Sequence, residues 1–377
     1  ILKSEIKQES THWLRKPKNY PQGPPSLPFV GALPMLALAG DFGMVSKLIQ
    51  YGDKFGKIFS LDLGSLRCVV INSSALIKEA FGNAATSGRP RLKTFKALTG
   101  GNFRGIALQD GPGWKEHRER FSHDDPKLLR LVSIISKATS ARRHFMDVYF
   151  EELDNRKSDL RSSFSGKIGE ENLTSALVDL FFAGSDTSST TLSWTCLYLA
   201  LHPKTQKKVK TEIDEVMGTN LPSLDHRKRM PYTEAVILES LRCSSVTQIG
   251  IARRVLEDFE VGGYVIPKDT LVFSNIYAAH HDPDVWDDPH RFKPERFLSS
   301  DEKHVVKHNA FVAFSYGKRS CPGETLAKDQ VFIFLTSILQ RFVVALDPLE
   351  KVPTMNAKFS TTRSPVPHRL ILEDCRI

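Results

Sequence analysis

One cysteine of this chain lies in a setting that suits a metal ligand. Cys321 falls between a glycine turn at Gly317 and an apolar helical pattern that follows Gly323. A sulfur near a helix N-terminus experiences a dipole that favours thiolate over thiol, and thiolate is the form that binds soft metals. The two glycines permit a close approach of the backbone to a flat ligand, while Arg319 supplies a fixed cation and Phe314 an aromatic contact. Together these residue types predict a cradle for an anionic iron porphyrin.

The spacing F-x-x-G-x-R-x-C-x-G, from Phe314 to Gly323, distinguishes this loop from an ordinary turn. The alternative is a loop with a buried structural cysteine, which is the commoner fate of an isolated Cys. The stretch resembles the haem-binding loop of the cytochromes P-450, the haem-thiolate monooxygenases. Carried over residue by residue, the resemblance makes Cys321 the axial ligand of the iron of haem b.

A long helix is predicted from Glu170 to Leu201, where it stops before a proline. Its length and apolar residues predict a central, largely buried helix; these residues are Leu173, Leu177, Leu180, Phe181, Leu192, Leu197 and Leu199. Midway it carries Ala183-Gly184-Ser185-Asp186-Thr187, where the poor helix formers Gly, Ser and Thr cluster and a carboxylate adjoins a hydroxyl. The alternative to a functional site is a packed helix kink.

The same five residues resemble the family's oxygen-activation motif, A-G-x-D-T. The resemblance implies that Ala183 and Gly184 leave room for dioxygen. It also implies that the hydroxyl of Thr187 and the carboxylate of Asp186 deliver protons.

Trp114 and Arg118 lie at i, i+4 on a predicted polar helix and so share one face. An indole N–H and a guanidinium on one side can bind a carboxylate, although a solvated helix face is the alternative. The pair resembles the family's helix that binds the haem propionates. Arg253 falls where many relatives carry a propionate-binding histidine, so the resemblance implies a further cationic contact there.

A second polar constellation is predicted to be structural. Glu239 and Arg242 lie at i, i+3, a spacing that by itself indicates a routine surface ion pair. With Arg296 downstream, the segments resemble the family's buried Glu-Arg-Arg network behind the haem loop. The adjacent His280 and His281 have no helical i, i+4 pair or third ligand nearby, so they are not interpreted as a metal site.

The composition is that of an ordinary globular protein, with 377 residues of which 41% are hydrophobic and 25% charged. It excludes disordered and fibrous classes. The net charge of +9 implies acidic partners, and without a nucleic-acid motif an anionic membrane or an acidic protein is favoured over nucleic acid. The five cysteines show no C-x-x-C pair, which favours a reducing compartment.

The predicted fold class is mainly α with small β-sheets (α+β), and it corresponds to the cytochrome P-450 fold with a long central helix and a C-terminal cysteine loop. Strands are predicted at 58–64 and 67–71 and at 259–261 and 264–266, and a helix at 324–342 with Phe334 among its inward residues. Residues 1–31 are predicted to be a linker and proline-rich hinge, and residues 32–377 a single haem-thiolate catalytic domain.

The stretch between Ser122 and the Ala183 motif is much shorter than the resemblance implies. Segments of the natural chain are therefore expected to be missing from this sequence between about 122 and 165. The apparent joins are at 123–126 and 161–164. The alternative is that several helices are truly absent.

The resemblance implies a monooxygenase that inserts one atom of O2 into a lipophilic substrate of the xenobiotic, steroid or fatty-acid type. Electrons would come from NADPH through the flavoprotein NADPH-cytochrome reductase, with cytochrome b5 as a second donor. A membrane anchor that is removed or absent here would place the protein on the cytoplasmic face of the endoplasmic reticulum. Basic residues predict a face for the acidic reductase, although solvated helix faces explain them equally well; they are Lys115, Arg120, Lys318, Lys328 and Arg341.

Three other functions stay open. The first is a hormone-biosynthetic hydroxylase rather than a detoxification enzyme. The second is a haem-thiolate isomerase of hydroperoxides, which would need neither reductase nor proton relay and is disfavoured by the intact Asp186-Thr187 pair. The third is a non-catalytic haem sensor, which would need a coordinating side chain near Gly184.

Overall fold

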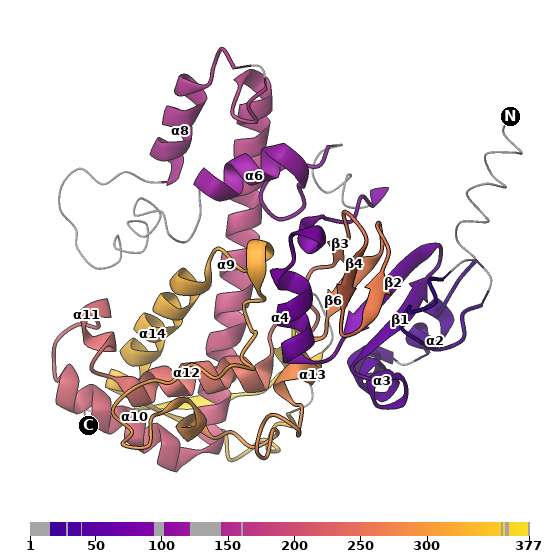
Figure 1. Cartoon of the computed structure of the whole chain (residues 1–377). Coiled ribbons are helices and arrows are strands. Elements are labelled where there is room, and N and C mark those ends of the chain that lie inside the picture. The colour runs from indigo at the N-terminus through magenta and orange to yellow at the C-terminus, as the bar shows by residue number, and fades with distance from the viewer. Residues whose placement is uncertain are drawn as a thin grey trace, which may run out of the picture. The chain divides into compact units, whose positions relative to one another are not determined.

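The computed structural model describes residues 16–27, 29–38, 40–93, 102–120, 145–159, 161–355, 357–358 and 362–375 (Figure 1). Its contacts divide the chain into two compact units. The first comprises Ile1–Gly88, Ile249–Asn275 and Tyr316–Arg319, and the second Arg89–Gln248, Ile276–Ser315 and Ser320–Ile377. Residues 1–15 of the predicted linker and the predicted join at 123–126 lie outside the described residues.

The first unit is built around a four-stranded sheet in the order β1-β2-β6-β3. β1 (Ile58–Leu63) and β2 (Leu66–Ile71) form the predicted antiparallel hairpin, which is confirmed. β2 pairs in parallel with β6 (Leu271–Ser274), which pairs antiparallel with β3 (Arg253–Arg254). Apolar side chains alternate onto one face of this sheet and bury against α3 (Gly40–Phe55).

Further short elements complete the first unit. They are α2 (Leu33–Ala37), α4 (Ser74–Gly82), η1 (Ala84–Ser87), η4 (Gly317–Arg319) and the hairpin of β4 (Phe259–Val261) with β5 (Tyr264–Ile266). The predicted hinge belongs to this unit, because Ser60 N donates to Gln22 O at 2.9 Å and Ala32 N donates to Asp62 O at 2.7 Å. Both ends of the proline-rich stretch are therefore tied to β1.

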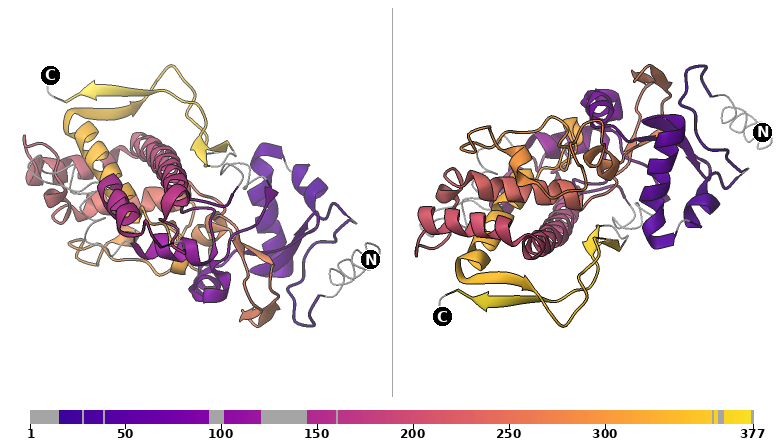
Figure 2. Two further views of the ribbon diagram at one scale, coloured as in Figure 1. Left: turned by 90° about the horizontal axis from the view of Figure 1, so that it is seen from above. Right: turned by 90° about the horizontal axis from the view of Figure 1, so that it is seen from below.

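The second unit is organised around α9 (Gly166–Leu201), a helix of 36 residues. Its C-terminal part is buried, with Trp194, Leu197 and Leu199 fully enclosed. The C-terminal part of α9 packs against α10 (Pro203–Val216), α12 (Pro231–Ser244) and α14 (Glu324–Arg341). Figure 2, which looks nearly along α9, shows α12 and α14 beside it.

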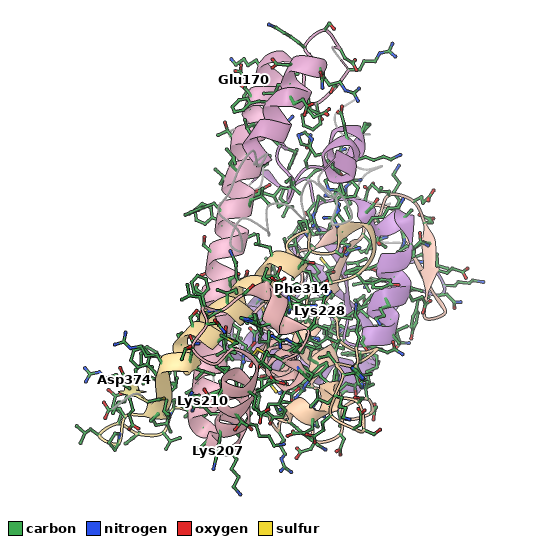
Figure 3. The ribbon with its side chains drawn as sticks, turned by 90° about the vertical axis from the view of Figure 1, so that its left-hand side faces the viewer. Glu170, Lys207, Lys210, Lys228, Phe314 and Asp374 are labelled. Atoms are coloured by element: carbon green, nitrogen blue, oxygen red, sulfur yellow. The ribbon has the colours of Figure 1, made fainter. Side chains whose placement is uncertain are left out.

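The prediction that the long helix is largely buried is wrong for its N-terminal half. Leu177, Leu180 and Phe181 are 36%, 38% and 70% exposed. A helix of 36 residues is about 54 Å long, so it extends past the core that α10, α12 and α14 enclose. Figure 3 shows this extension, with Glu170 near its end. A small hydrophobic cluster with Tyr149 of α8 (Phe145–Asn155) buries Leu173 and Ala176 in this half.

The remaining elements of the second unit are short. They are α6 (Gly111–Arg120), α11 (Leu224–Arg227), α13 (Ile276–His280), η3 (Pro294–Phe297) and the antiparallel pairs of β7 (Phe342–Leu346) with β10 (Leu370–Asp374) and β8 (Ala357–Lys358) with β9 (Ser364–Pro365). On α14 the inward stripe does not include Phe334, which is 56% exposed, contrary to prediction. Phe332 and Leu335 define the buried face instead, and Phe334 points away from it.

The predicted class, mainly α with small sheets, is confirmed. Within the described part of the chain, the helices are too short or too polar to cross a bilayer.

Candidate functional site

A backbone hydrogen bond within the second unit joins Cys321 to the start of its loop. Cys321 N donates to Phe314 O at 2.9 Å, and Gly323 is the N-cap residue of α14. The sulfur therefore lies just before a helix N-terminus, as predicted. A Cβ added at Gly323 would have one heavy atom of the described chain within 4 Å, the sulfur of Cys321 at 3.9 Å. The space beside Gly323 is thus open to a flat ligand.

Burial outweighs the helix dipole at this thiol. Burial raises the pKa of Cys321 above its ordinary value, while the Gly323 N–H and the Arg118 guanidinium lower it and Glu324 raises it. The prediction that the helix dipole by itself favours the thiolate is therefore wrong, because burial has the larger effect on the pKa of Cys321. A coordinated iron would reverse the balance, because metal ligation deprotonates a thiol. A half-buried thiol with a cation beside it is a donor set that fits haem iron.

Arg118 contacts the residue that precedes the cysteine. Its Nη2 donates to Ser320 O at 3.0 Å and to Ser320 Oγ at 3.3 Å, which ties α6 to the residue before Cys321. Trp114, one turn earlier on α6, is 7% exposed. The structure therefore brings Arg118 and the cysteine segment together, and the binding of a propionate by this helix stays a prediction.

In the first unit, Gly317 has a neighbour that sequence patterns do not predict. Its φ is +72°, and a Cβ there would lie 1.8 Å from Phe81 O. Glycine is needed because the backbone of α4 approaches, independently of any ligand. Arg319 Nε, two residues later, donates to Ser87 O at 2.8 Å.

Arg253 binds the same loop segment within the first unit. Its Nη2 donates to Tyr316 O at 2.6 Å, and its guanidinium lies 3.6 Å from the centroid of the Phe81 ring. Arg253 is 1% exposed, so its charge is compensated by carbonyl and ring contacts inside this unit. These contacts position the segment 316–319, and a propionate contact of Arg253 stays a prediction.

The A-G-S-D-T run lies within α9, which runs as one continuous helix from Gly166 to Leu201. Thr187 Oγ1 donates to Ala183 O at 2.6 Å, and the hydroxyls of Thr191 and Thr195 repeat this bond one and two turns later. Such back-bonding lets threonine fit a helix interior. A Cβ at Gly184 would have no described heavy atom outside its own helix backbone within 4 Å, so this face of α9 is open.

The carboxylate of Asp186 has a partner far away in the sequence. Thr362 Oγ1 donates to Asp186 Oδ2 at 2.8 Å. The two residues are 176 positions apart, and no motif or spacing in the sequence could have indicated the contact.

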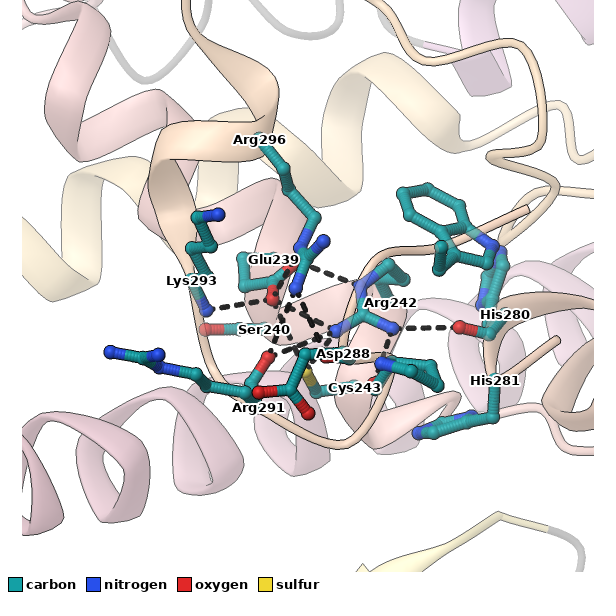
Figure 4. Close-up of polar contacts among 12 residues, drawn as sticks. Glu239, Ser240, Arg242, Cys243, His280, His281, Asp288, Arg291, Lys293 and Arg296 are labelled. Atoms are coloured by element: carbon teal, nitrogen blue, oxygen red, sulfur yellow. Dashed lines mark hydrogen bonds and ion pairs between the residues drawn. The ribbon is translucent and has the colours of Figure 1, made fainter. Parts of the chain in front are cut away.

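The structure brings Glu239, Arg242 and Arg296 together (Figure 4). Arg242 donates through Nε and Nη2 to the two carboxylate oxygens of Glu239 at 2.8 and 2.9 Å, and Arg296 Nε donates to Glu239 Oε1 at 3.0 Å. Lys293 N adds a bond to the same carboxylate at 2.8 Å. Glu239 and Arg242 are 0% exposed. A bidentate arginine pair with every contact satisfied is suited to holding α12 against η3.

The adjacent histidines serve packing. The Nε2 of His280 accepts from Val312 N at 3.0 Å, and the Nδ1 of His281 donates to Tyr277 O at 2.9 Å. In the described part of the chain, no three side chains of His, Cys, Asp or Glu gather as a metal site.

This chain is similar to known proteins over most of its length. The family described as Cytochrome P450 matches residues 21–124 and 125–372. Cytochrome P450 2J2 of Homo sapiens is 30% identical over 477 residues, covering 94% of this chain and 91% of that protein. Cytochrome P450 2D15 of Canis lupus familiaris is 28% identical and covers 99% of this chain and 96% of that protein.

A solved structure supports the fold. A zebra fish cytochrome P450 with abiraterone superimposes with a TM-score of 0.75 at 24% identity, covering 88% of this chain and 99% of that one. The family match and the similarity to the Homo sapiens protein together span most of the sequence. The chain therefore belongs to the cytochrome P450 family of haem monooxygenases.

Proposed function

We propose that this chain inserts one atom of dioxygen into a lipophilic substrate of the xenobiotic, steroid or fatty-acid type. The observation that carries the proposal is the half-buried thiol of Cys321, with Arg118 fixed to the preceding residue and open space beside Gly323. This is the donor set that haem iron needs in the haem-thiolate enzymes.

Haem b would be held by the thiolate of Cys321 and by cations at its propionates. The cations are Arg118 and Arg319, with Trp114 and Arg253 completing the set and Phe314 packing against the ring. When bound, haem supplies dioxygen activation, and thiolate ligation increases the electron density at iron.

The residues of α9 would manage protons and space. Gly184 leaves its face open, and Asp186 is exposed, so its carboxylate can exchange protons with water. Thr187 holds its hydroxyl proton against Ala183 O and can release it by rotation about χ1. These two oxygens would hold and move a proton towards the substrate side of the helix.

Electrons would come from NADPH through NADPH-cytochrome reductase or cytochrome b5, at the cytoplasmic face of the endoplasmic reticulum. Two of the predicted basic contacts already have partners, because Lys328 pairs with Glu324 at 2.7 Å and Arg341 with Asp374 at 3.1 Å. The side chain of Arg120 lies outside the described residues. Charge-guided docking predicts that reductase-supported turnover falls as salt rises, and turnover that ignores salt would contradict it.

Missing internal residues are part of the same proposal. The alignment with the Homo sapiens relative runs over 477 residues, more than the 377 of this chain, and the family match breaks at 124/125. The apolar surface of α9 around Phe181 is what such residues would cover. Sequencing the full transcript tests this: an uninterrupted message with no extra codons between 122 and 165 would contradict it.

The test of the site is the reduced carbon monoxide spectrum of the wild type and of Cys321→Ala, with Cys375→Ala as a matched control. Cys375 is an exposed free cysteine. The wild type and the control are expected to show the thiolate-haem band, and Cys321→Ala to lose it. A colourless wild type, or a band that persists in Cys321→Ala, would overturn the proposal.

A substrate screen with reductase then separates the alternatives. Oxidation of foreign lipophilic compounds favours a detoxification enzyme, and selective oxidation of a steroid favours a hormone-biosynthetic hydroxylase. Turnover of hydroperoxides without NADPH would indicate an isomerase, and bound haem without any turnover would indicate a sensor.

A further inference from the structure

The described segment that begins with Thr362 is anchored by the next residue within the second unit. The next residue, Arg363, donates its backbone N–H to Val246 O at 2.7 Å. Its carbonyl accepts from Trp194 Nε1 at 2.8 Å. Trp194 belongs to α9, eight residues after Asp186, so the helix that carries the acid also holds this anchor.

The side chain of Arg363 strengthens the anchor. It is 6% exposed and donates to Ser244 O at 2.9 Å and to Met355 O at 2.7 Å. Its guanidinium also lies 4.6 Å from the ring centroid of Trp194 and 5.3 Å from that of Tyr277. A buried arginine that is held by two carbonyls and two rings cannot move without breaking several contacts. Thr362 is thereby fixed at the position from which its hydroxyl reaches Asp186.

A threonine hydroxyl has a property that suits a carboxylate which gains and loses a proton. It donates to the ionised acid, as Thr362 Oγ1 does to Asp186 Oδ2 at 2.8 Å, and it accepts from the protonated acid. A lysine or a backbone N–H could only donate. The bond can therefore survive both protonation states, and the second carboxylate oxygen of Asp186 stays available for proton exchange.

We propose that Thr362 is a positioning residue, which holds the Asp186 carboxylate in one orientation while that group takes up and releases protons. The inference rests on the proposed proton-delivery role of Asp186. Thr362 is 7% exposed, whereas Asp186 is exposed, so the hydroxyl comes from the protein interior and the proton from the solvent side.

The test compares Thr362→Val, which keeps the shape and removes the hydroxyl, with Thr362→Ser, which keeps the hydroxyl. In the haem-loaded protein with reductase, the fraction of NADPH electrons that reach product is measured against the fraction lost as hydrogen peroxide. Thr362→Val is expected to lower kcat and the product fraction by about 10-fold at unchanged KM, and Thr362→Ser to restore them to within about 2-fold.

A matched control is Thr195→Val. Thr195 is also a buried threonine whose hydroxyl bonds within α9, to Thr191 O at 2.8 Å, away from Asp186. This variant is expected to lose thermal stability without losing the product fraction. If Thr362→Val behaves in the same way, with a lower Tm and unchanged coupling per haem, the positioning role is overturned.

Asp186→Asn tests the proton-delivery role of Asp186 separately from the positioning role of Thr362. If Asp186→Asn keeps the wild-type product fraction, the proposed role of Asp186 fails and the inference fails with it. If Asp186→Asn is uncoupled and Thr362→Val is not, only the inference fails. A readout independent of turnover is the Tm of the double variant of Asp186→Ala with Thr362→Val, which is expected to be no lower than that of Asp186→Ala, because alanine already removes the hydrogen bond that the two residues share. Additive shifts would contradict the contact.

Discussion

Two polar groups on helices of the second unit differ in how completely their carboxylates are satisfied. Glu239 on α12 accepts from Arg242, Arg296 and the Lys293 amide, and it is 0% exposed. Asp186 on α9 is exposed and receives, among the described residues, the hydroxyl of Thr362. A buried carboxylate that accepts hydrogen bonds from fixed cations is suited to a structural role. A carboxylate that is reached by water, and whose partner is a hydroxyl that can either donate or accept, can change its protonation state.

The difference extends to the surroundings. Arg242 also donates to the carbonyls of His280 and Pro289 at 2.7 and 2.8 Å, and it lies 5.0 Å from the ring centroid of Trp286. The network thus joins α12 to the last residue of α13 and to the segment that follows it. Around Asp186 the helix face is open at Gly184. The contacts around Glu239 and Arg242 fix the elements that they join, whereas the face of α9 at Gly184 leaves space for a ligand.

The largest expected effect comes from breaking the saturated network. Glu239→Ala leaves Arg242 buried without its carboxylate, so the free energy of unfolding should fall by about 3–5 kcal/mol and haem retention should fall with it. Urea unfolding of the haem-loaded protein measures this. The control is Glu373→Ala, at an exposed position of β10, which should change little. Equal stability of the two variants would show that the network is not structural.

Acid pH tests the same region through His280. Burial, with a smaller contribution from Arg242, lowers the pKa of His280 from 6.5 to about 3. The folded chain keeps this ring neutral while the unfolded chain binds a proton below its ordinary pKa. Stability is therefore present above about pH 6.5 and is lost as the pH falls towards 3, with a slope of up to about 1.4 kcal/mol per pH unit.

The measurement is urea unfolding at several pH values between about 7 and about 5. His280→Gln should make the pH dependence of stability shallower, because about one proton fewer is taken up on unfolding. His304→Gln, at an exposed position, should leave that dependence unchanged. Burial also lowers the pKa of His281, so part of the acid loss should remain in His280→Gln. An unaltered slope in His280→Gln would contradict the assignment.

Local pattern predicted the elements well, because helix and strand periods are properties of neighbouring residues. The hairpin of β1 and β2 and the long helix through Asp186 follow from such periods. What covers a helix is not local, and so the exposure of Phe181 was missed. Sequence also cannot show that the carbonyl of Phe81, rather than a ligand, requires glycine at Gly317.

The candidate site was predicted only as far as its motifs reach. The pair of Glu239 and Arg242 has a helical spacing, and the resemblance supplied Arg296. The contact of Thr362 with Asp186 has no such spacing, because it forms only when the folded chain brings the two residues together. The charge state of the Cys321 thiol depends on burial, which the order of residues does not give.

The open region is expected to show the opposite response to mutation. Thr187→Val removes a hydroxyl that bonds to Ala183 O, so stability should change by no more than about 1 kcal/mol. The product fraction should fall by about 10-fold or more, because proton delivery is lost. The control is Thr174→Val on the same helix, where an exposed hydroxyl makes the same kind of bond to Glu170 O at 3.1 Å. Equal coupling in both variants would place Thr187 outside the proton path.

The smallest effect is expected where an ion pair lacks burial. Lys210 and Asp214 pair at i, i+4 on α10, with side chains 27% and 55% exposed (Figure 3 labels Lys210). Water screens this pair, so a double-mutant cycle with alanine should give an interaction free energy of about 0.5 kcal/mol or less. This interaction free energy should vanish at high salt. Glu239 and Arg242 have nearly the same helical spacing, so spacing is matched and burial differs. A coupling above about 2 kcal/mol at Lys210 would show that burial is not what separates structural from solvent-exposed charge in this chain.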